Sequence, residues 1–128
     1  MISIIDDDRS VREAVQSLIR SLGYEAAIFA SAEEYLGSQR VHDTECIITD
    51  VQMPGMTGID LRDRLVADGY HRPIIFMSAL SPEEAGSAGS SETFASRFLR
   101  KPFTDDRLID CLDQALNCRT NLGVSLPK

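Results

Sequence analysis

The chain has 128 residues, of which 43% are apolar and 26% charged, and its formal net charge is −7. This length and composition are typical of one soluble globular domain with a buried core. The negative charge argues against direct binding to nucleic acid, which normally requires a basic face. The sequence lacks the roughly 20-residue apolar run of a membrane span, and residues 1–5 are too short and uncharged for a signal peptide. We therefore expect a cytoplasmic protein.

Short apolar runs alternate with amphipathic stretches along the chain. We expect strands at residues 2–5, 25–29, 46–50, 73–78 and 97–100. We expect helices at 9–22, from Ser31 onward, at 58–68 and at 104–118. The first helix carries apolar residues at helical spacing and ends at Gly23, a natural C-terminal cap. Ser31 with Glu34 resembles a capping box, and Thr104 suits the start of the last helix.

Residues 82–96 interrupt the alternation where a fourth helix is expected. The segment contains Gly86 and Gly89, each of which costs about 1 kcal/mol inside a helix, and its only large apolar residue is Phe94. We expect this helix to be short, frayed or missing.

The three cysteines have no metal-type spacing and are odd in number. We interpret Cys46, Cys111 and Cys118 as reduced, small apolar residues of a reducing compartment. His42 and His71 fall in loop-like stretches without evident partners, and we interpret both as plain surface histidines.

Strands separated by helices predict a parallel sheet that is covered on both faces. In such sheets ligands bind at the carboxyl ends of the strands, where the winding reverses. Polar residues stand at four of these ends: Asp6, Asp7, Asp50, Ser78 and Lys101. We therefore expect these side chains to meet at one site.

The chemistry of these side chains indicates phosphoryl transfer onto a carboxylate. Crowded carboxylates need a cation, and Mg²⁺ prefers oxygen ligands. Asp50 could accept a phosphoryl group as an acyl phosphate. Lys101 could hold one phosphoryl oxygen, and Ser78 could donate a hydrogen bond to another.

A set of motifs in order and at matching spacing resembles the receiver domain of two-component response regulators. The motifs are Asp6-Asp7, Asp50-x-x-Met53-Pro54-Gly55-x-x-Gly58, Ser78-Ala79 and Lys101-Pro102-Phe103. The stretch from Val51 to Gly58 and the Lys101-Pro102-Phe103 ending resemble the receivers of nitrogen-fixation-type regulators in particular. The resemblance covers residues 1–118, and we interpret 119–128 as a C-terminal tail or linker remnant. We expect either a stand-alone receiver or the receiver of a longer regulator.

The resemblance implies a fold and a function. The fold would be α/β and flavodoxin-like, a doubly wound five-stranded parallel sheet of order 2-1-3-4-5 flanked by helices. The protein would be a signalling switch rather than an enzyme with external turnover. It would take a phosphoryl group from a sensor histidine kinase and act on a downstream protein or output domain. A homodimer is compatible with the family.

The resemblance also implies residue roles. Asp50 would be the phosphoacceptor, while Asp7, Asp50 and the backbone carbonyl of Gln52 would bind Mg²⁺ directly and Asp6 mainly through water. Asp8 would lie outside the metal's direct ligands. Ser78 and Lys101 would contact the phosphoryl group, and the Lys101–Pro102 bond would be cis.

Phe98 matches the aromatic switch position of the family and would follow Ser78 on phosphorylation, although an ordinary core phenylalanine remains the alternative. Leu80 stands where relatives often carry a polar residue near the attacking water. We therefore expect slow loss of the phosphoryl group.

Two other functions remain open. A degenerate receiver would bind partners without being phosphorylated. The presence of all the pocket residues argues against this alternative, and the weak fourth helix keeps it open. A Mg²⁺-dependent phosphohydrolase would also form an aspartyl phosphate, but such enzymes usually carry a second aspartate where Gln52 stands, and they need cap insertions. A nucleotide-binding domain is disfavoured because the first strand is not followed by Gly-x-Gly-x-x-Gly.

Overall fold

A computed structural model describes residues 1–70, 72–79, 98–101 and 103–124, with side chains described as far as residue 116. Within these ranges, parallel strands form one sheet in the order β2-β1-β3-β4-β5, which confirms the predicted fold. The strands are β1 (Ile2–Ile5), β2 (Ala26–Phe29), β3 (Cys46–Asp50), β4 (Ile74–Ser78) and β5 (Phe98–Arg100). The winding reverses between β1 and β3, so a crevice is expected at their carboxyl ends.

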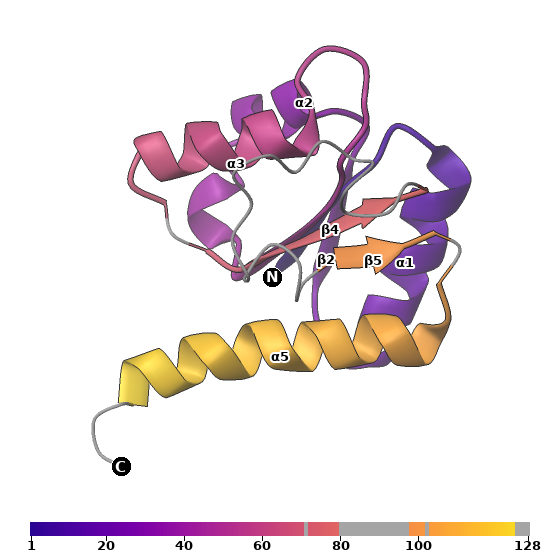
Figure 1. The fold of residues 1–128 in the computed structure, drawn as a ribbon, viewed down its shortest axis with the longest axis vertical. Coiled ribbons are helices and arrows are strands. Elements are labelled where there is room, and N and C mark those ends of the chain that lie inside the picture. The colour runs from indigo at the N-terminus through magenta and orange to yellow at the C-terminus, as the bar shows by residue number, and fades with distance from the viewer. Residues whose placement is uncertain (71, 80–97, 102, 125–128) are drawn as a thin grey trace.

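The helices cover both faces of the sheet. They are α1 (Arg9–Ser21), α2 (Ala32–Gly37), α3 (Gly58–Ala67) and α5 (Asp105–Val124), with a short 3₁₀ turn at Val41–Asp43. In Figure 1, α1 and α5 lie on one side of the sheet, and α2 and α3 lie on the other. The predicted fourth helix at 82–96 lies outside the described residues. None of the helices in the described ranges is long and apolar enough to cross a membrane.

The core consists of two main layers, one on each face of the sheet. Neighbouring strand residues point to opposite faces, as the period of a β-strand requires: Ile48 packs toward α1 and α5, whereas Ile47 packs toward α2 and α3. All of β1 and β3 is buried. This explains why these strands are mostly apolar rather than alternating.

Helix ends follow the sequence signals, with two corrections. Gly23 follows α1 with φ +96°, as the predicted cap requires. Ser31 caps α2, but Glu34 accepts from the backbone N–H of Ala30 rather than of Ser31, so the predicted capping box is wrong. The complete capping box of the described residues belongs to Thr57 at the start of α3. Helix α5 continues to Val124 and does not end at 118.

A buried polar network ties β1 to the segment before β3. The Thr44 hydroxyl lies 2.8 Å from the Ser3 hydroxyl, accepts a hydrogen bond from Tyr35 at 2.8 Å, and donates to the Arg40 carbonyl at 2.7 Å. Burial raises the pKa of Tyr35, against the lowering effect of its hydrogen bond to Thr44. The network satisfies the polar atoms of Ser3 and Thr44 that the packed strands bury.

The predictions for the cysteines and histidines have mixed outcomes. Cys46 and Cys111 are buried, as expected for small apolar residues, and burial raises the pKa of Cys111. The side chain of Cys118 and all of His71 lie outside the described part. His42 is exposed, as predicted for a surface histidine, but the prediction that it lacks a partner was wrong. Its ring meets Tyr70 edge-on at 5.2 Å between centroids, and the Tyr70 hydroxyl lies 3.1 Å from its Nε2.

Candidate functional site

The carboxyl ends of four strands bring the predicted residues to one edge of the sheet. Asp6 follows β1, and Asp50 and Ser78 are the last residues of β3 and β4. Lys101 follows β5. The register pairs Asp50 with Met77, next to Ser78, and Ser78 with Arg100, next to Lys101. Residues that are far apart in the sequence are therefore neighbours at this edge.

Three carboxylates converge there. Asp6, Asp7 and Asp50 each offer a carboxylate oxygen, and these atoms all lie within 4.8 Å of one another. Asp6 is fully buried and Asp50 is 7% exposed, whereas Asp7 is exposed to solvent. Oxygen atoms at this spacing and of this charge fit a hard divalent cation.

Lys101 supplies the positive charge facing the cluster. Its Nζ donates a hydrogen bond to Asp6 Oδ2 at 2.8 Å and lies 3.5 Å from Asp50 Oδ2. Burial works against the Lys101 charge, but the hydrogen bond to Asp6 and the attraction of Asp50 and Asp6 outweigh it and raise the lysine's pKa. The Lys101 N–H also donates to the Ser78 carbonyl at 2.6 Å, which ties the ends of β4 and β5 together.

Asp50 is the carboxylate of this cluster whose pKa the fold raises. Burial, followed by repulsion from Asp6, raises its pKa from 3.8 to about 6, although Lys101 and the N–H of Gln52 act in the opposite direction. That N–H donates to Asp50 Oδ1 at 3.3 Å. A buried anion that the protein only partly neutralises is suited to a further cation or an electrophile.

The turn after β1 holds Asp6 in place. Asp6 Oδ1 accepts from the N–H of Asp8 at 2.8 Å, and Asp8 caps α1 by accepting from Ser10 at 2.9 Å and Val11 at 3.4 Å. Asp6 and Asp7 therefore belong to the acidic cluster, while Asp8 caps the start of α1. One short acidic run thus contributes both to the acidic cluster and to a helix cap, through different residues.

Arg12 is a site neighbour that the sequence patterns did not indicate. Its Nη1 donates to the main-chain carbonyl of Asp6 at 2.8 Å. A cation near the N-terminus of a helix opposes the helix dipole, and this local conflict is the signal that could have identified it. Arg12 adds positive charge beside the cluster.

Gly58 fixes the chain after Asp50. Its N–H donates to the Val51 carbonyl at 2.9 Å, and a β-carbon at this position would overlap the Asp50 carbonyl oxygen. Only glycine allows α3 to begin so close to the end of β3. The predicted Gly58 of the motif thus has a steric reason.

The other predicted site residues are placed as follows. Ser78 is 1% exposed, and Gln52 is exposed two residues after Asp50. Phe98 is buried and packs with Val51 and Phe76 on the sheet; its switch role stays a prediction. Leu80 and Pro102 lie outside the described residues, and so does the predicted cis bond.

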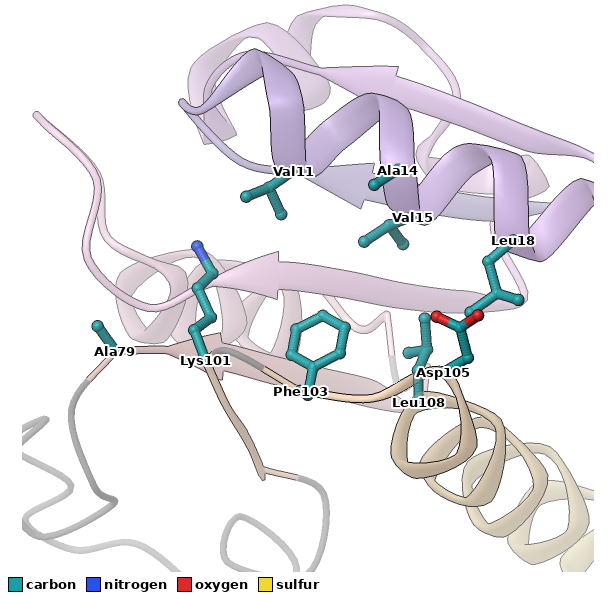
Figure 2. Close-up of a pocket in the computed structure, with 9 residues that line it drawn as sticks. All are labelled: Val11, Ala14, Val15, Leu18, Ala79, Lys101, Phe103, Asp105 and Leu108. Carbon is teal, nitrogen blue, oxygen red and sulfur yellow. The ribbon is translucent and has the colours of Figure 1, made fainter.

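An apolar groove of about 450 Å³ opens beside the acidic cluster. Figure 2 shows Val11, Val15 and Leu18 pointing from α1 across the groove toward Phe103 and Leu108, with Lys101 at one end and Asp105 at the other. The groove thus ends at Lys101, the residue that contacts Asp6 and Asp50.

Comparison with known proteins agrees with this geometry. The sequence model of the response regulator receiver domain matches residues 2–113. The response regulator protein TodT of Pseudomonas putida is 35% identical over 128 residues, covering 100% of this chain and 56% of TodT. The transcriptional regulatory protein FixJ of Bradyrhizobium diazoefficiens is 32% identical over 115 residues, covering 90% of this chain and 56% of FixJ. The structure of the response regulator StyR superposes with a TM-score of 0.80 at 33% identity, covering 97% of this chain and 62% of StyR.

The fold and the acidic edge define a two-component signalling domain. The chain belongs to the response regulator receiver family, which confirms the predicted resemblance. It spans about half the length of the curated relatives it matches.

Proposed function

We propose that this receiver takes a phosphoryl group from a sensor histidine kinase onto Asp50, with Mg²⁺ bound, and changes conformation to control a downstream protein or output domain. The observation that carries the proposal is the convergence of Asp6, Asp7 and Asp50 within 4.8 Å, with Lys101 against two of them. Asp50 is at once buried, anionic at neutral pH and close to a fixed cation.

The donor set fits Mg²⁺. Asp7 and Asp50 would bind the ion directly together with the backbone carbonyl of Gln52, and Asp6 would act mainly through water. When bound, Mg²⁺ neutralises negative charge on the phosphoryl oxygens. The raised pKa of Asp50 supports the fit, because burial and Asp6 make its anion costly without a further cation.

The protein's own residues would then carry out the transfer. An Asp50 oxygen forms a bond to phosphorus while the bond from phosphorus to the histidine nitrogen of the donor breaks, and the electron pair of that bond stays on the nitrogen. Lys101 would move from Asp50 to a phosphoryl oxygen while keeping its contact with Asp6. The Ser78 hydroxyl would hold a second phosphoryl oxygen.

The switch would start from Ser78 and reach Phe98 across the last two strands. Ser78 pairs with Arg100 in the register, and the Ser78 carbonyl accepts from the N–H of Lys101. A shift of Ser78 toward a phosphoryl group would therefore displace β5, which begins at Phe98. Two packings of this edge would be the states that phosphorylation selects between.

The kinase would dock on the groove between α1 and the start of α5. The groove is apolar and reaches Lys101 at one end, so a donor protein seated there has its phosphohistidine close to Asp50. Ala14 on α1 lies on this groove and is exposed. One partner would thus contact both the groove and Asp50.

One experiment tests the proposal and separates it from the alternatives. The protein is incubated with Mg²⁺ and acetyl phosphate or beryllofluoride, and the adduct is measured by mass spectrometry or NMR. We expect an adduct that requires Mg²⁺ and is absent in Asp50→Asn. No adduct and no response to Mg²⁺ would instead indicate a binding module, and sustained rapid release of phosphate would indicate a phosphohydrolase. A phosphorylated half-life of only seconds would contradict the slow loss expected from Leu80.

A further inference from the structure

The loop between β3 and α3 carries Gln52 and is held at both ends. At its start, the N–H of Gln52 donates to Asp50 Oδ1. The side chain of Met53 is buried in the core on the α2 and α3 face. At its end, Gly58 packs closely against the Asp50 carbonyl, and its N–H donates a hydrogen bond to the Val51 carbonyl. Between these points, Gly55 and Met56 belong to neither a strand nor a helix.

A side chain from another element holds this middle part. Glu33 Oε2 accepts a hydrogen bond from the N–H of Met56 at 3.0 Å. Gly55 has φ +77°, and a β-carbon there would lie 2.8 Å from the same Glu33 oxygen. The Glu33 carboxylate therefore rests directly on the turn, where the positive φ of Gly55 favours glycine.

Glu33 is not needed to begin its own helix. The start of α2 is capped by Ser31, whose hydroxyl accepts from the N–H of Glu34 at 3.0 Å, and by Glu34, which accepts from Ala30 at 2.6 Å. Glu33 instead reaches a segment 23 residues away in the sequence. It is exposed, so core packing does not explain its place.

We propose that Glu33 is a positioning residue of the phosphoacceptor loop. By fixing the Met56 amide, it restricts the backbone between Gln52 and Gly58, and so holds Gln52 in the position from which its carbonyl serves the metal site. Its consequence for Mg²⁺ rests on the proposed function. Its consequence for the loop does not, because the hydrogen bond is made by the protein alone.

Three variants of the full chain isolate the effect. Glu33→Ala removes the acceptor, and Glu33→Gln keeps a side-chain oxygen that can accept from Met56. Glu34→Ala is the matched control, since it also removes an acidic side chain and a backbone hydrogen bond from the first turn of α2 but leaves the loop alone. All three are measured beside the wild type by NMR, first without metal and then through a Mg²⁺ titration.

We expect amide hydrogen exchange of Met56 in the metal-free protein to rise at least about fivefold in Glu33→Ala, the factor that one hydrogen bond of modest net strength supports. Glu34→Ala should leave it unchanged. The Mg²⁺ dissociation constant should also rise about fivefold in Glu33→Ala, with Glu33→Gln close to the wild type and global stability in urea equal for the two alanine variants.

Equal Met56 exchange in Glu33→Ala and Glu34→Ala would overturn the proposal. So would a loss in Glu33→Gln as large as in Glu33→Ala, because it would assign the effect to charge and not to the hydrogen bond. If the wild type forms no Mg²⁺-dependent adduct, the proposed function fails, while the metal-free exchange measurement still decides the role of Glu33.

Discussion

Replacing Asp50 by asparagine should stabilise the metal-free protein at pH 7.5. The fold raises the pKa of Asp50 from 3.8 to about 6, through burial first and the charge of Asp6 second. A shift of that size corresponds to about 3 kcal/mol by which the ionised side chain disfavours the folded state. The attraction of Lys101 is already included in this shift, and asparagine keeps an oxygen for the Gln52 N–H. We therefore expect a net gain of about 3 kcal/mol.

The gain must depend on pH with a definite sign. Below pH 3.8, Asp50 is protonated in both the folded and the unfolded chain and contributes no difference. Between pH 3.8 and about 6, the folded protein retains a proton that the unfolded chain has released, so the wild type loses stability as the pH rises through this window. Asparagine does not titrate. The advantage of Asp50→Asn should therefore be near zero at pH 4 and complete at pH 7.5.

Urea unfolding in EDTA at pH 4 and pH 7.5 measures this difference, with exposed Asp113→Asn on α5 as the control for loss of one negative charge. Addition of Mg²⁺ should stabilise the wild type but not Asp50→Asn, since ligand binding to the folded state alone raises its stability. If Asp50→Asn is less stable than the wild type in EDTA at pH 7.5, or if its advantage is the same at both pH values, the assigned electrostatics are wrong.

Three further perturbations test separate features. Gly58→Ala places a β-carbon on the Asp50 carbonyl; we expect a loss of about 2–3 kcal/mol in urea unfolding, and a loss under 0.5 kcal/mol would contradict the steric reason given for this glycine. Thr44→Val leaves the buried hydroxyls of Ser3 and Tyr35 without their shared partner and should cost about 2 kcal/mol, with an unchanged midpoint arguing against the network. Ala14→Arg obstructs the groove beside α1 and should slow phosphoryl transfer from the cognate kinase at least about tenfold, while labelling by acetyl phosphate stays normal; equal slowing of both reactions would place the fault in the acceptor site, not in docking.

Much of the fold follows from local sequence patterns. The apolar runs of β1 and β3 and the stripe of α1 are strong, and they agree with the turn chemistry at Gly23. Boundaries were less certain because they depend on individual hydrogen bonds. Glu34 accepts its hydrogen bond from Ala30, one residue earlier than a capping box requires. The complete capping box starts at Thr57, inside a motif that the sequence analysis uses only for its chemistry.

The gathering of the site was predictable because parallel strands share a carboxyl edge, which brings Asp6, Asp50 and Lys101 together whatever the loops do. Contacts that depend on side-chain reach were not predictable. Arg12 and Glu33 act on main-chain atoms of Asp6 and Met56, and neither partner carries a side-chain signature of that contact. The contact of His42 with Tyr70 is unpredictable for the same reason, since the two residues are 28 apart in the sequence.

The hydrogen bond from Lys101 to Asp6 joins residues that are 95 apart in the sequence. This separation sets the time between the synthesis of the two partners. A ribosome adding about 5–20 residues per second needs about 5–20 seconds between the two. Throughout that interval Asp6 and Asp50 are already part of the chain while the lysine that faces them in the folded protein is not. The acidic edge can therefore reach its final electrostatic balance only after residue 101 has been added, and a product that ends before this residue would lack that cation.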